Sequence, residues 1–266
     1  MIRRVGIFLL LFFSAPALMV SSVVHADTIE MMKWKVDGVD RQALVYSPAA
    51  DTGKTPVIFV FHGHGDNVGG SAHRMDIQDA WPEAIVVYMQ GLPTISAIDP
   101  AGKLPGWQRE PGDNGDRDLR FFDAVLVTLH EKFPVDNHRI YAMGFSNGAI
   151  FTYVLWGERP NIFAAFAPCS GKIFPAVRLT EPKPVFIVAG AVDKLVVARD
   201  RDAAIKTARQ LNGATGKGDA CGPGCAVYRT TKTAEVRVLI HPGGHLYPPQ
   251  ISPEIVSFFK NQRLKN

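Results

Sequence analysis

The pentapeptide Gly144-Phe145-Ser146-Asn147-Gly148 decides the fold of this chain. It follows an apolar, strand-like run at residues 139–143 and precedes an apolar, helix-like run that begins at Ala149. Glycines two residues before and two residues after the serine permit a tight strand-to-helix turn, because glycine brings no Cβ atom into a crowded backbone. Such a turn holds the serine hydroxyl out from the backbone, and the helix directs free N–H groups toward it. The pattern therefore predicts a nucleophile elbow.

Continuous apolar runs on both sides of this motif indicate a parallel sheet, because strands buried on both faces lack polar alternation. Before these runs, residues 30–36 and 42–46 alternate around the Asp37-Gly38 turn as two antiparallel strands. We expect an α/β fold with a mostly parallel central sheet, antiparallel N-terminal strands and helices on both faces. The expected parallel strands are residues 56–61, 84–88, 139–143, 163–167, 184–189 and 236–240, and the expected helices are residues 119–133, 147–156, 201–211 and 253–260.

The first 26 residues have the composition of a signal peptide. Arg3 and Arg4 precede an apolar run at residues 5–20, and Val24-His25-Ala26 suits a signal peptidase. An uncleaved anchor helix is the alternative, but the apolar run is short for a membrane span. We expect residues 1–26 to be removed and residues 27–266 to form a single catalytic domain. The mature chain is then secreted or periplasmic, with no stable membrane anchor.

Charge and cysteine content limit the possible partners. Loss of the two N-terminal arginines lowers the formal charge from +4 to 4 − 2 = +2, so we infer no nucleic-acid surface. In an oxidising compartment Cys221 and Cys225 could close a small loop and leave Cys169 free. Pairing of Cys169 with either of the other two is the alternative, and the spacing does not choose between them. The oligomeric state is left open.

Side chains at two further strand ends offer partners for the serine. A serine hydroxyl attacks efficiently when a histidine held by a carboxylate takes its proton. Asp193 follows the strand at residues 184–189, and His245 follows the strand at residues 236–240. Ligands of open α/β sheets bind at the carboxyl ends of the strands. The chain order Ser146, Asp193, His245 is the order expected of the α/β-hydrolase fold, and we predict these three as the catalytic triad.

Each triad partner has an alternative. Asp193 could merely cap a turn or helix, as we expect of Asp200 and Asp202. His241 could compete with His245 as the base. We rank His241 lower because it lies closer to the strand and before the two glycines that would let the loop bend back over the sheet.

A glycine-rich turn at residues 62–65, directly after the first expected parallel strand, predicts the remaining catalytic element. A turn at this place supplies a backbone N–H beside the nucleophile. We assign the backbone N–H of His64, together with that of Asn147, to an oxyanion hole, with Gly65 as the second choice for the first donor.

The same turn offers a metal-site alternative. His62, His64 and Asp66 have the alternate spacing of some zinc sites, but Asn67 stands where a further histidine would follow. A metal site would also leave the serine motif unexplained. We therefore expect no metal and no organic cofactor.

The irregular stretch at residues 90–116 is rich in glycine, proline and aspartate, and ordered loops of this length are usually functional. We place it near the substrate. Trp107 in this stretch and Tyr247, two residues after His245, are predicted as substrate-binding aromatic residues. The alternative for both is a packing role.

With these residues in place, the chain resembles the secreted polyhydroxybutyrate depolymerase and feruloyl esterase-like branch of the α/β-hydrolases. The resemblance extends from about Met32 to the end and rests on residues 61–63, 141–148, 163–171, 184–193 and 243–248. It implies the same triad, with His64 as the first oxyanion donor. Members of this branch often carry Cys at the position of His64 and Trp at that of Tyr247, so the acyl and alcohol groups stay open.

The resemblance implies a serine esterase that hydrolyses carboxylic esters of the hydroxyalkanoate-oligomer or feruloyl type through an acyl-enzyme. The sequence contains no appended polymer-binding module, which favours soluble esters or oligomers over a solid polymer. Two alternatives are a serine peptidase of the same fold and a non-catalytic binding protein that kept the fold.

Overall fold

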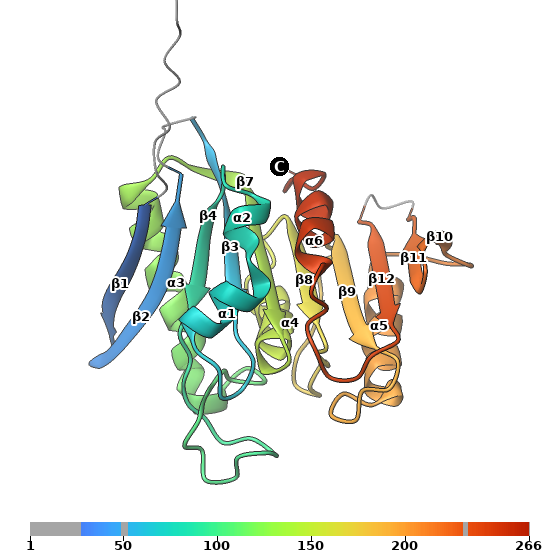
Figure 1. The fold of residues 1–266 in the computed structure, drawn as a ribbon, viewed down its shortest axis with the longest axis horizontal. Coiled ribbons are helices and arrows are strands. Elements are labelled where there is room, and N and C mark those ends of the chain that lie inside the picture. Colours follow the sequence, from blue (N-terminus) through green and yellow to red (C-terminus); the bar gives the residue numbers. More distant parts are fainter. Residues whose placement is uncertain (1–27, 49–52, 231–233, 266) are drawn as a thin grey trace, which may run out of the picture.

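Within the described residues, ten strands form the central sheet in the order β1-β2-β4-β3-β7-β8-β9-β12-β11-β10 (Figure 1). The structure is a computed structural model that describes residues 28–48, 53–230 and 234–265. The predicted signal peptide, residues 1–26, lies outside these residues. The strands are β1 (Thr28–Val36), β2 (Val39–Ser47), β3 (Thr55–Phe61), β4 (Ile85–Met89), β7 (Val135–Phe145), β8 (Ala165–Cys169), β9 (Val185–Gly190), β10 (Asp219–Gly222), β11 (Cys225–Tyr228) and β12 (Val236–His241).

The middle of the sheet is parallel and both of its ends are antiparallel. Strands β4, β3, β7, β8, β9 and β12 pair in parallel in that order. Strands β1 and β2 extend the sheet antiparallel on one side, and β11 and β10 do so on the other. The predicted parallel centre and antiparallel N-terminal strands are confirmed. The β10–β11 hairpin is an addition that the sequence pattern does not predict.

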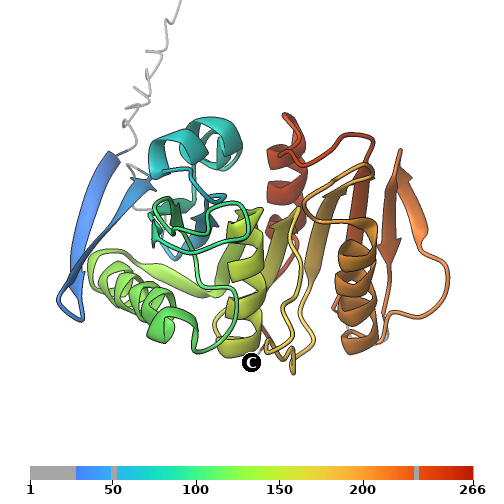
Figure 2. The same ribbon diagram turned by 90° about the horizontal axis from the view of Figure 1, so that it is seen from below.

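Helices cover both faces of the sheet, which gives three layers (Figure 2). On one face lie α3 (Arg117–Lys132), α4 (Asn147–Glu158) and α5 (Ala198–Leu211), and on the other lie α1 (Val68–Met75), α2 (Ile77–Ala80) and α6 (Ile251–Lys260). Alternate residues of a central strand enter different cores, because successive side chains of a strand point to opposite faces. On β3, for example, Phe59 packs into the core between the sheet and α3, α4 and α5, whereas Ile58 packs into the core between the sheet and α1, α2 and α6.

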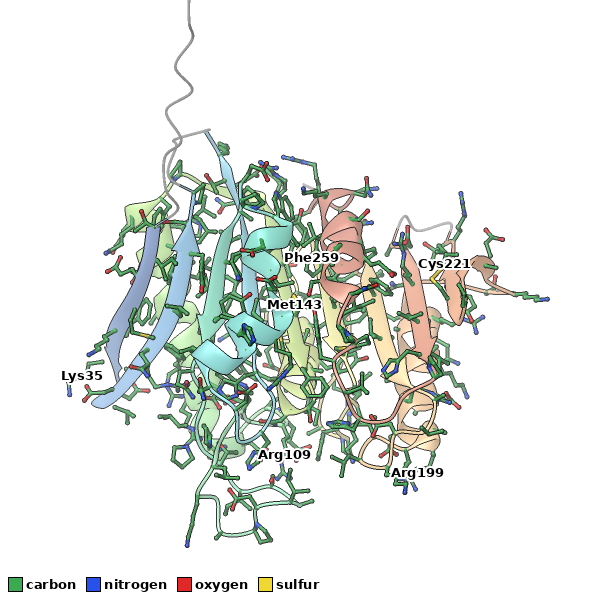
Figure 3. The ribbon with its side chains drawn as sticks, in the orientation of Figure 1. Lys35, Arg109, Met143, Arg199, Cys221 and Phe259 are labelled. Atoms are coloured by element: carbon green, nitrogen blue, oxygen red, sulfur yellow. A yellow bond between two sulfur atoms is a disulfide. The ribbon has the colours of Figure 1, made fainter. Side chains whose placement is uncertain are left out.

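The carboxyl ends of the parallel strands lie together at the lower edge of the sheet in Figure 1. The stretch at residues 90–116 extends from this edge and contains β5 (Leu92–Pro93), β6 (Pro105–Gly106) and the 3₁₀-helix η1 (Asp113–Asp116). Arg109 and Arg199, labelled in Figure 3, lie at the same edge. The loops that follow β3, β7, β9 and β12 therefore meet on one side of the molecule.

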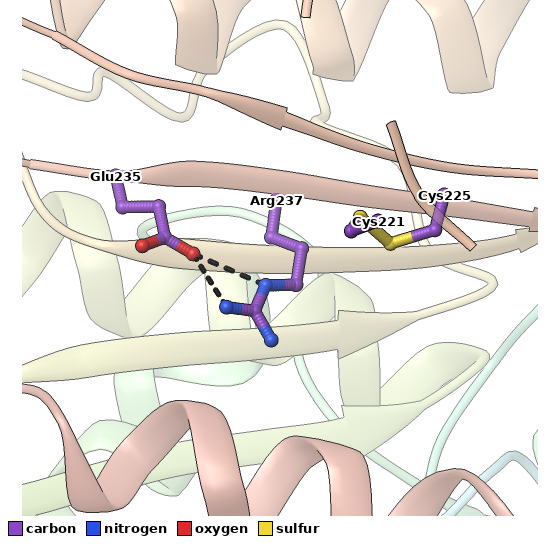
Figure 4. The surroundings of a disulfide bond; sticks show 4 residues. All are labelled: Cys221, Cys225, Glu235 and Arg237. Carbon is purple, nitrogen blue, oxygen red and sulfur yellow. Dashed lines mark hydrogen bonds and ion pairs between the residues drawn. A yellow bond between two sulfur atoms is a disulfide. The ribbon is translucent and has the colours of Figure 1, made fainter. Parts of the chain in front are cut away.

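A disulfide between Cys221 and Cys225 closes the turn between β10 and β11, beside the ion pair of Glu235 and Arg237 (Figure 4). Cys169 is free and buried at the end of β8, and burial raises the pKa of its thiol. Of the three pairings that the spacing allows, the structure has Cys221 with Cys225. Among the described residues, no helix is both long and apolar enough to cross a bilayer.

Candidate active site

Ser146 occupies a strained turn between β7 and α4. Its backbone has φ 55° and ψ −116°, a combination that residues with a side chain rarely adopt. The N–H of Ser146 donates to the carbonyl of Cys169 at 2.9 Å, which holds the turn against β8. The turn also packs closely on β3, because a Cβ atom at Gly148 would lie 2.1 Å from the carbonyl oxygen of Phe61. Glycine at position 148 is therefore a steric requirement of this elbow.

His245 lies between the other two predicted triad residues. Its Nε2 is 2.7 Å from Ser146 Oγ, and its Nδ1 is 2.8 Å from Asp193 Oδ2. The Asp193 side chain is 2% exposed and that of His245 is 16% exposed. A carboxylate accepts a hydrogen bond from Nδ1–H, which leaves Nε2 as the acceptor that faces the serine hydroxyl. The three side chains thus form one hydrogen-bonded chain with the order that proton abstraction from serine requires.

Backbone hydrogen bonds hold the Asp193 carboxylate in place. Its second oxygen, Oδ1, accepts the N–H of Leu195 at 2.8 Å and the N–H of Val196 at 2.9 Å. Both carboxylate oxygens are therefore engaged, one with the loop and one with the imidazole. This arrangement fixes the orientation of Asp193 independently of His245.

The loop that carries Asp193 is bound directly to the loop that carries His245. The N–H of Ala191 donates to the carbonyl of His241 at 2.8 Å, and the N–H of Val192 donates to that of Gly243 at 3.2 Å. The two loops touch at Gly190, where a Cβ atom would lie 2.2 Å from the carbonyl oxygen of Gly244. This close approach brings the acid and the base together from two strands.

The alternative residues have other partners. His241 is buried, its Nδ1 accepts the N–H of Gly243 at 3.2 Å, and burial lowers its pKa. Asp200 lies in the first turn of α5, where it pairs with Lys172 and Arg199, and Asp202 pairs with Arg201. Of these candidates, Asp193 and His245 are the two that the structure brings to Ser146.

The glycine-rich turn lies beside the nucleophile. A Cβ atom at Gly63 would lie 3.5 Å from Ser146 Cβ, so the turn is in contact with the elbow. The backbone N–H groups of His64 and Asn147 have no hydrogen-bond partner within the described part of the chain. Asn147 begins α4, and the first N–H groups of a helix have no intrahelical acceptor. Both predicted oxyanion donors are thus uncommitted.

His62 orients the peptide that carries one of these donors. Its Nε2 accepts the N–H of Gly91 at 2.9 Å, so its proton is on Nδ1, which donates to the carbonyl of Gly63 at 2.7 Å. Burial lowers the pKa of His62, which favours this neutral form. In a trans peptide the C=O and the following N–H point in opposite directions. The bond from His62 therefore leaves the N–H of His64 on the opposite side of the peptide.

The residues of the metal-site alternative do not converge. Both ring nitrogens of His62 bind backbone groups, His64 Nε2 faces Asp99 Oδ2 at 3.3 Å, and Asp66 pairs with Arg74 at 2.7 Å. In residues 28–48, 53–230 and 234–265, no group of three or more potential ligands is placed to hold a metal ion.

Trp107, predicted as a substrate-binding residue, has the alternative packing role in the structure. Its side chain is completely buried, stacks on Phe151 with ring centroids 5.5 Å apart, and meets the ring of Phe61 edge-on at 5.2 Å. The indole N–H donates to the carbonyl of His62 at 2.9 Å. Trp107 therefore attaches the irregular stretch to the core.

Tyr247 is also a packing residue, which corrects the prediction that it contacts the substrate. It is 5% exposed, and its hydroxyl is 2.7 Å from Ser252 Oγ. Its ring meets Phe145 edge-on at 6.4 Å. Burial raises its pKa well above the ordinary tyrosine value.

Exposed apolar side chains occur instead on the loops around the triad. Ile95 and Ile98 are each 63% exposed and Leu104 is 47% exposed, all within the stretch at residues 90–116. Val192 and Leu246, which flank Asp193 and His245 in sequence, are 63% and 41% exposed. These residues are not among the predictions from the sequence. Their only sequence signal is that they are aliphatic residues in irregular loops next to the expected site.

A hollow lies between the segment after β8 and the start of α5. It has a volume of about 580 Å³ and is lined by Lys172, Phe174, Arg178, Arg199, Asp200 and other residues. The cations Lys172 and Arg109 lie 5.0 Å and 5.2 Å from the centre of the Phe174 ring. Asp200 forms ion pairs with Lys172 and Arg199, which partly neutralise the positive charge of the residues that line the hollow.

No protein-family model matches the chain. The chain is 28% identical over 163 residues to a bifunctional acetylxylan esterase/xylanase of Neocallimastix patriciarum, which covers 60% of this chain and 22% of that protein. It is 30% identical over 117 residues to a probable feruloyl esterase C of Aspergillus clavatus, which covers 44% of this chain and 40% of the relative. The chain spans less than half the length of these two curated relatives.

Among solved structures, the acetyl xylan esterase from Aspergillus awamori is similar with a TM-score of 0.66 at 15% identity, over 88% of this chain and 99% of that one. This likeness shows the α/β-hydrolase fold. In sequence the chain resembles feruloyl esterases, as predicted, and also an acetylxylan esterase, which the sequence pattern does not predict. The polyhydroxybutyrate depolymerase part of the resemblance stays a prediction.

Proposed function

We propose that this protein is a serine esterase that hydrolyses carboxylic esters through a covalent acyl-enzyme. The observation that carries the proposal is the hydrogen-bonded chain from Ser146 Oγ through His245 to Asp193, with distances of 2.7 Å and 2.8 Å. The proposal draws further support from relatives that are named esterases.

The reaction begins when His245 Nε2 accepts the proton of Ser146 and the serine oxygen attacks the ester carbonyl carbon. The carbonyl π electrons move to oxygen and form a tetrahedral oxyanion, which accepts hydrogen bonds from the N–H groups of His64 and Asn147. His245 then gives its proton to the departing alkoxide, the C–O bond breaks, and an alcohol and a serine ester result. Water repeats the sequence with the serine as leaving group, which releases the acid and restores the enzyme.

Asp193 serves the histidine throughout this cycle. It holds the imidazole with Nε2 toward the serine and stabilises the imidazolium that forms after each proton transfer. Its own hydrogen bonds from Leu195 and Val196 keep it in place while the imidazole changes charge. None of these steps uses a metal ion or an organic cofactor.

For the substrate, we propose an ester with an apolar or aromatic acyl group, either of the feruloyl type or a hydroxyalkanoate oligomer. The feruloyl esterases among the relatives favour the first. Ile95, Ile98 and Leu104, rather than the buried Trp107, are the proposed acyl contacts, because they present aliphatic surface to solvent at this edge of the sheet. Contact with about 100 Å² of such surface would contribute about 2–3 kcal/mol.

Comparison of model esters tests the proposal. Hydrolysis of p-nitrophenyl esters of graded chain length is measured beside methyl ferulate and hydroxybutyrate oligomers, with and without a serine-directed phosphonate. We expect turnover that the phosphonate abolishes. Peptide hydrolysis with no ester turnover would favour the serine peptidase alternative, and binding with no turnover would favour the non-catalytic protein.

We also propose that the protein is exported and that residues 1–26 are removed as a signal peptide. The charged start, apolar run and small residue at Ala26 support this. N-terminal sequencing of the protein recovered from the periplasm or medium tests it, with Asp27 as the expected first residue. An intact N-terminus on a membrane-bound product would instead support the anchor alternative.

A further inference from the structure

The segment from Leu92 to Trp107, here called the 92–107 loop, contacts the side chains of both predicted oxyanion donors. The short strands β5 and β6 close this loop, with Leu92 opposite Gly106 and Pro93 opposite Pro105. It extends beyond the lower edge of the sheet between β4 and α3 in Figure 1. The two donors, in contrast, come from separate elements, the turn after β3 and the start of α4.

The first anchor joins the loop to His64. His64 Nε2 is 3.3 Å from Asp99 Oδ2, and the same oxygen accepts the N–H of Leu104 at 2.8 Å. The bond from Leu104 is the main cause of a lowered pKa at Asp99, which keeps the carboxylate ionised as an acceptor. The His64 side chain is 4% exposed. A carboxylate at Nε2 requires the imidazole to donate from that nitrogen.

The loop backbone packs against the other side of the same imidazole. His64 Nδ1 is buried and has no hydrogen-bond partner among the described residues. A Cβ atom at Gly106 would lie 2.6 Å from this nitrogen, so the loop closes over it. The next residue of the turn is also tied to the loop, because the N–H of Gly65 donates to the carbonyl of Pro105 at 2.8 Å.

The second anchor joins the loop to Asn147. Its Oδ1 accepts the N–H of Trp107 at 2.6 Å, and its Nδ2 donates to the carbonyl of Trp107 at 3.1 Å. The Asn147 side chain thus binds both the backbone N–H and the backbone carbonyl of Trp107. Trp107 is in turn fixed in the core through its bond to the carbonyl of His62. The side chain of the second donor is thus committed to the loop, and its backbone N–H is left for the oxyanion.

We propose that the 92–107 loop sets the geometry of the oxyanion hole. Two side chains act as positioning residues: Asp99, which binds His64, and Asn147, which binds the loop at Trp107. This inference rests on the proposed function. The loop holds the side chains of both donor residues, and these two residues share no direct hydrogen bond in the described part of the chain. A shift of the loop therefore displaces both donors relative to Ser146. Oxyanion stabilisation depends on preorganised donors at hydrogen-bond distance from the developing charge. Loss of an anchor therefore lowers the rate of the chemical step and leaves the triad intact.

The test compares three variants. Asp99→Ala removes the first anchor, and we expect kcat for p-nitrophenyl acetate to fall about 10–100-fold with KM within about threefold, since loss of a whole donor costs about 10²–10³. Asp99→Asn should retain most of the activity, because its amide oxygen can accept both hydrogen bonds. Asn147→Ala removes the second anchor without removing the backbone N–H, and we expect the same loss of kcat.

Ser96→Ala is the matched control within the loop. Ser96 Oγ accepts the N–H of Asp99 at 3.1 Å but touches neither predicted donor. We expect wild-type kcat and KM from this variant. Equal losses in Ser96→Ala and Asp99→Ala would mean that the loop matters only for its own fold, and would overturn the proposal.

Binding of an alkyl boronic acid gives a readout that a merely structural role would not move. Its tetrahedral adduct with serine places an oxygen in the oxyanion hole, whereas the product alcohol does not. In Asp99→Ala we expect boronate affinity to fall by the same factor as kcat/KM, with alcohol inhibition unchanged. Parallel losses of both affinities, or wild-type kcat in Asp99→Ala and Asn147→Ala, would overturn the proposal. Failure of the proposed function would look different: the wild type would lack esterase activity, or Ser146→Ala would keep it.

Discussion

The imidazole of His245 bridges Ser146 and Asp193, at 2.7 Å from the serine Oγ and 2.8 Å from the carboxylate. The three residues come from loops after β7, β9 and β12, so the parallel sheet is what brings together positions that are up to 99 residues apart in the chain. This arrangement makes Nδ1 of His245 the donor to Asp193 and Nε2 the acceptor that faces the Ser146 hydroxyl. Substitution of one residue at a time therefore tests the role of each.

Asp193→Asn should lower kcat by about 10³–10⁴-fold, because an amide that donates to the imidazole stabilises the wrong tautomer. Asp200→Asn is the matched control, since Asp200 pairs with Lys172 and Arg199. Steady-state kinetics on a p-nitrophenyl ester compares the two. If Asp200→Asn cost as much as Asp193→Asn, the assignment of the triad acid would have to change.

Stability should fall as the pH drops below the ordinary histidine value, because burial lowers the pKa of His62. The unfolded chain then binds protons that the folded protein excludes, so this contribution is complete above a pH of about 6.5 and decreases below it. Denaturant unfolding between pH 7.5 and pH 5 measures the effect. In His62→Gln the free energy of unfolding should decrease less steeply as the pH falls. Part of the remaining decrease comes from His241, because burial lowers its pKa as well. An unchanged slope in His62→Gln would contradict the expected contribution.

Trp107→Ala should destabilise the fold by about 3–5 kcal/mol, as expected for the loss of a large buried aromatic side chain. Because Trp107 also anchors the 92–107 loop, we expect activity to fall by a similar factor on short and long esters. Thermal unfolding and kinetics on acetate and octanoate esters check both points. A stable variant with loss confined to long esters would restore Trp107 as a substrate contact.

Ile98→Ser should lower kcat/KM for long-chain esters by about 5–30-fold, since removal of aliphatic contact costs about 1–2 kcal/mol. The acetate ester has no long acyl chain to make such a contact, so its kcat/KM should be unchanged. Val127→Ser is the control, because Val127 is 58% exposed on α3 and lies outside the loops that carry the site. The p-nitrophenyl acetate to octanoate series measures the effect, and an equal loss on every ester would exclude Ile98 from the acyl site.

The sequence predicts the centre of this molecule well, because its signals are local or periodic. Apolar runs mark the parallel strands, and the spacing of Gly144 and Gly148 around Ser146 marks the elbow. Asp193 and His245 follow from their places after two such strands. The physical basis is that parallel strands end on the same edge, so residues directly after them must meet.

Other features depend on contacts that no local pattern encodes. The orientation of Trp107 is decided by the distant rings of Phe61 and Phe151, so composition could place it in a loop without telling whether it faces the core. The β10–β11 hairpin is short and contains glycine, so its sequence pattern is that of an irregular loop. The Cys221–Cys225 disulfide that closes it does not follow from the spacing of the cysteines. The anchor between His64 and Asp99 joins residues 35 positions apart and has no sequence signature.

The most direct test of the central claim is the turnover of p-nitrophenyl acetate by Ser146→Ala, measured beside the wild type and with circular dichroism as a check of folding. If Ser146 is the nucleophile, the wild type hydrolyses the ester and is inactivated by one equivalent of a phosphonate. The folded variant does not react with the phosphonate, and its kcat is lower by about six orders of magnitude. A folded Ser146→Ala protein with turnover within tenfold of the wild type would contradict the account.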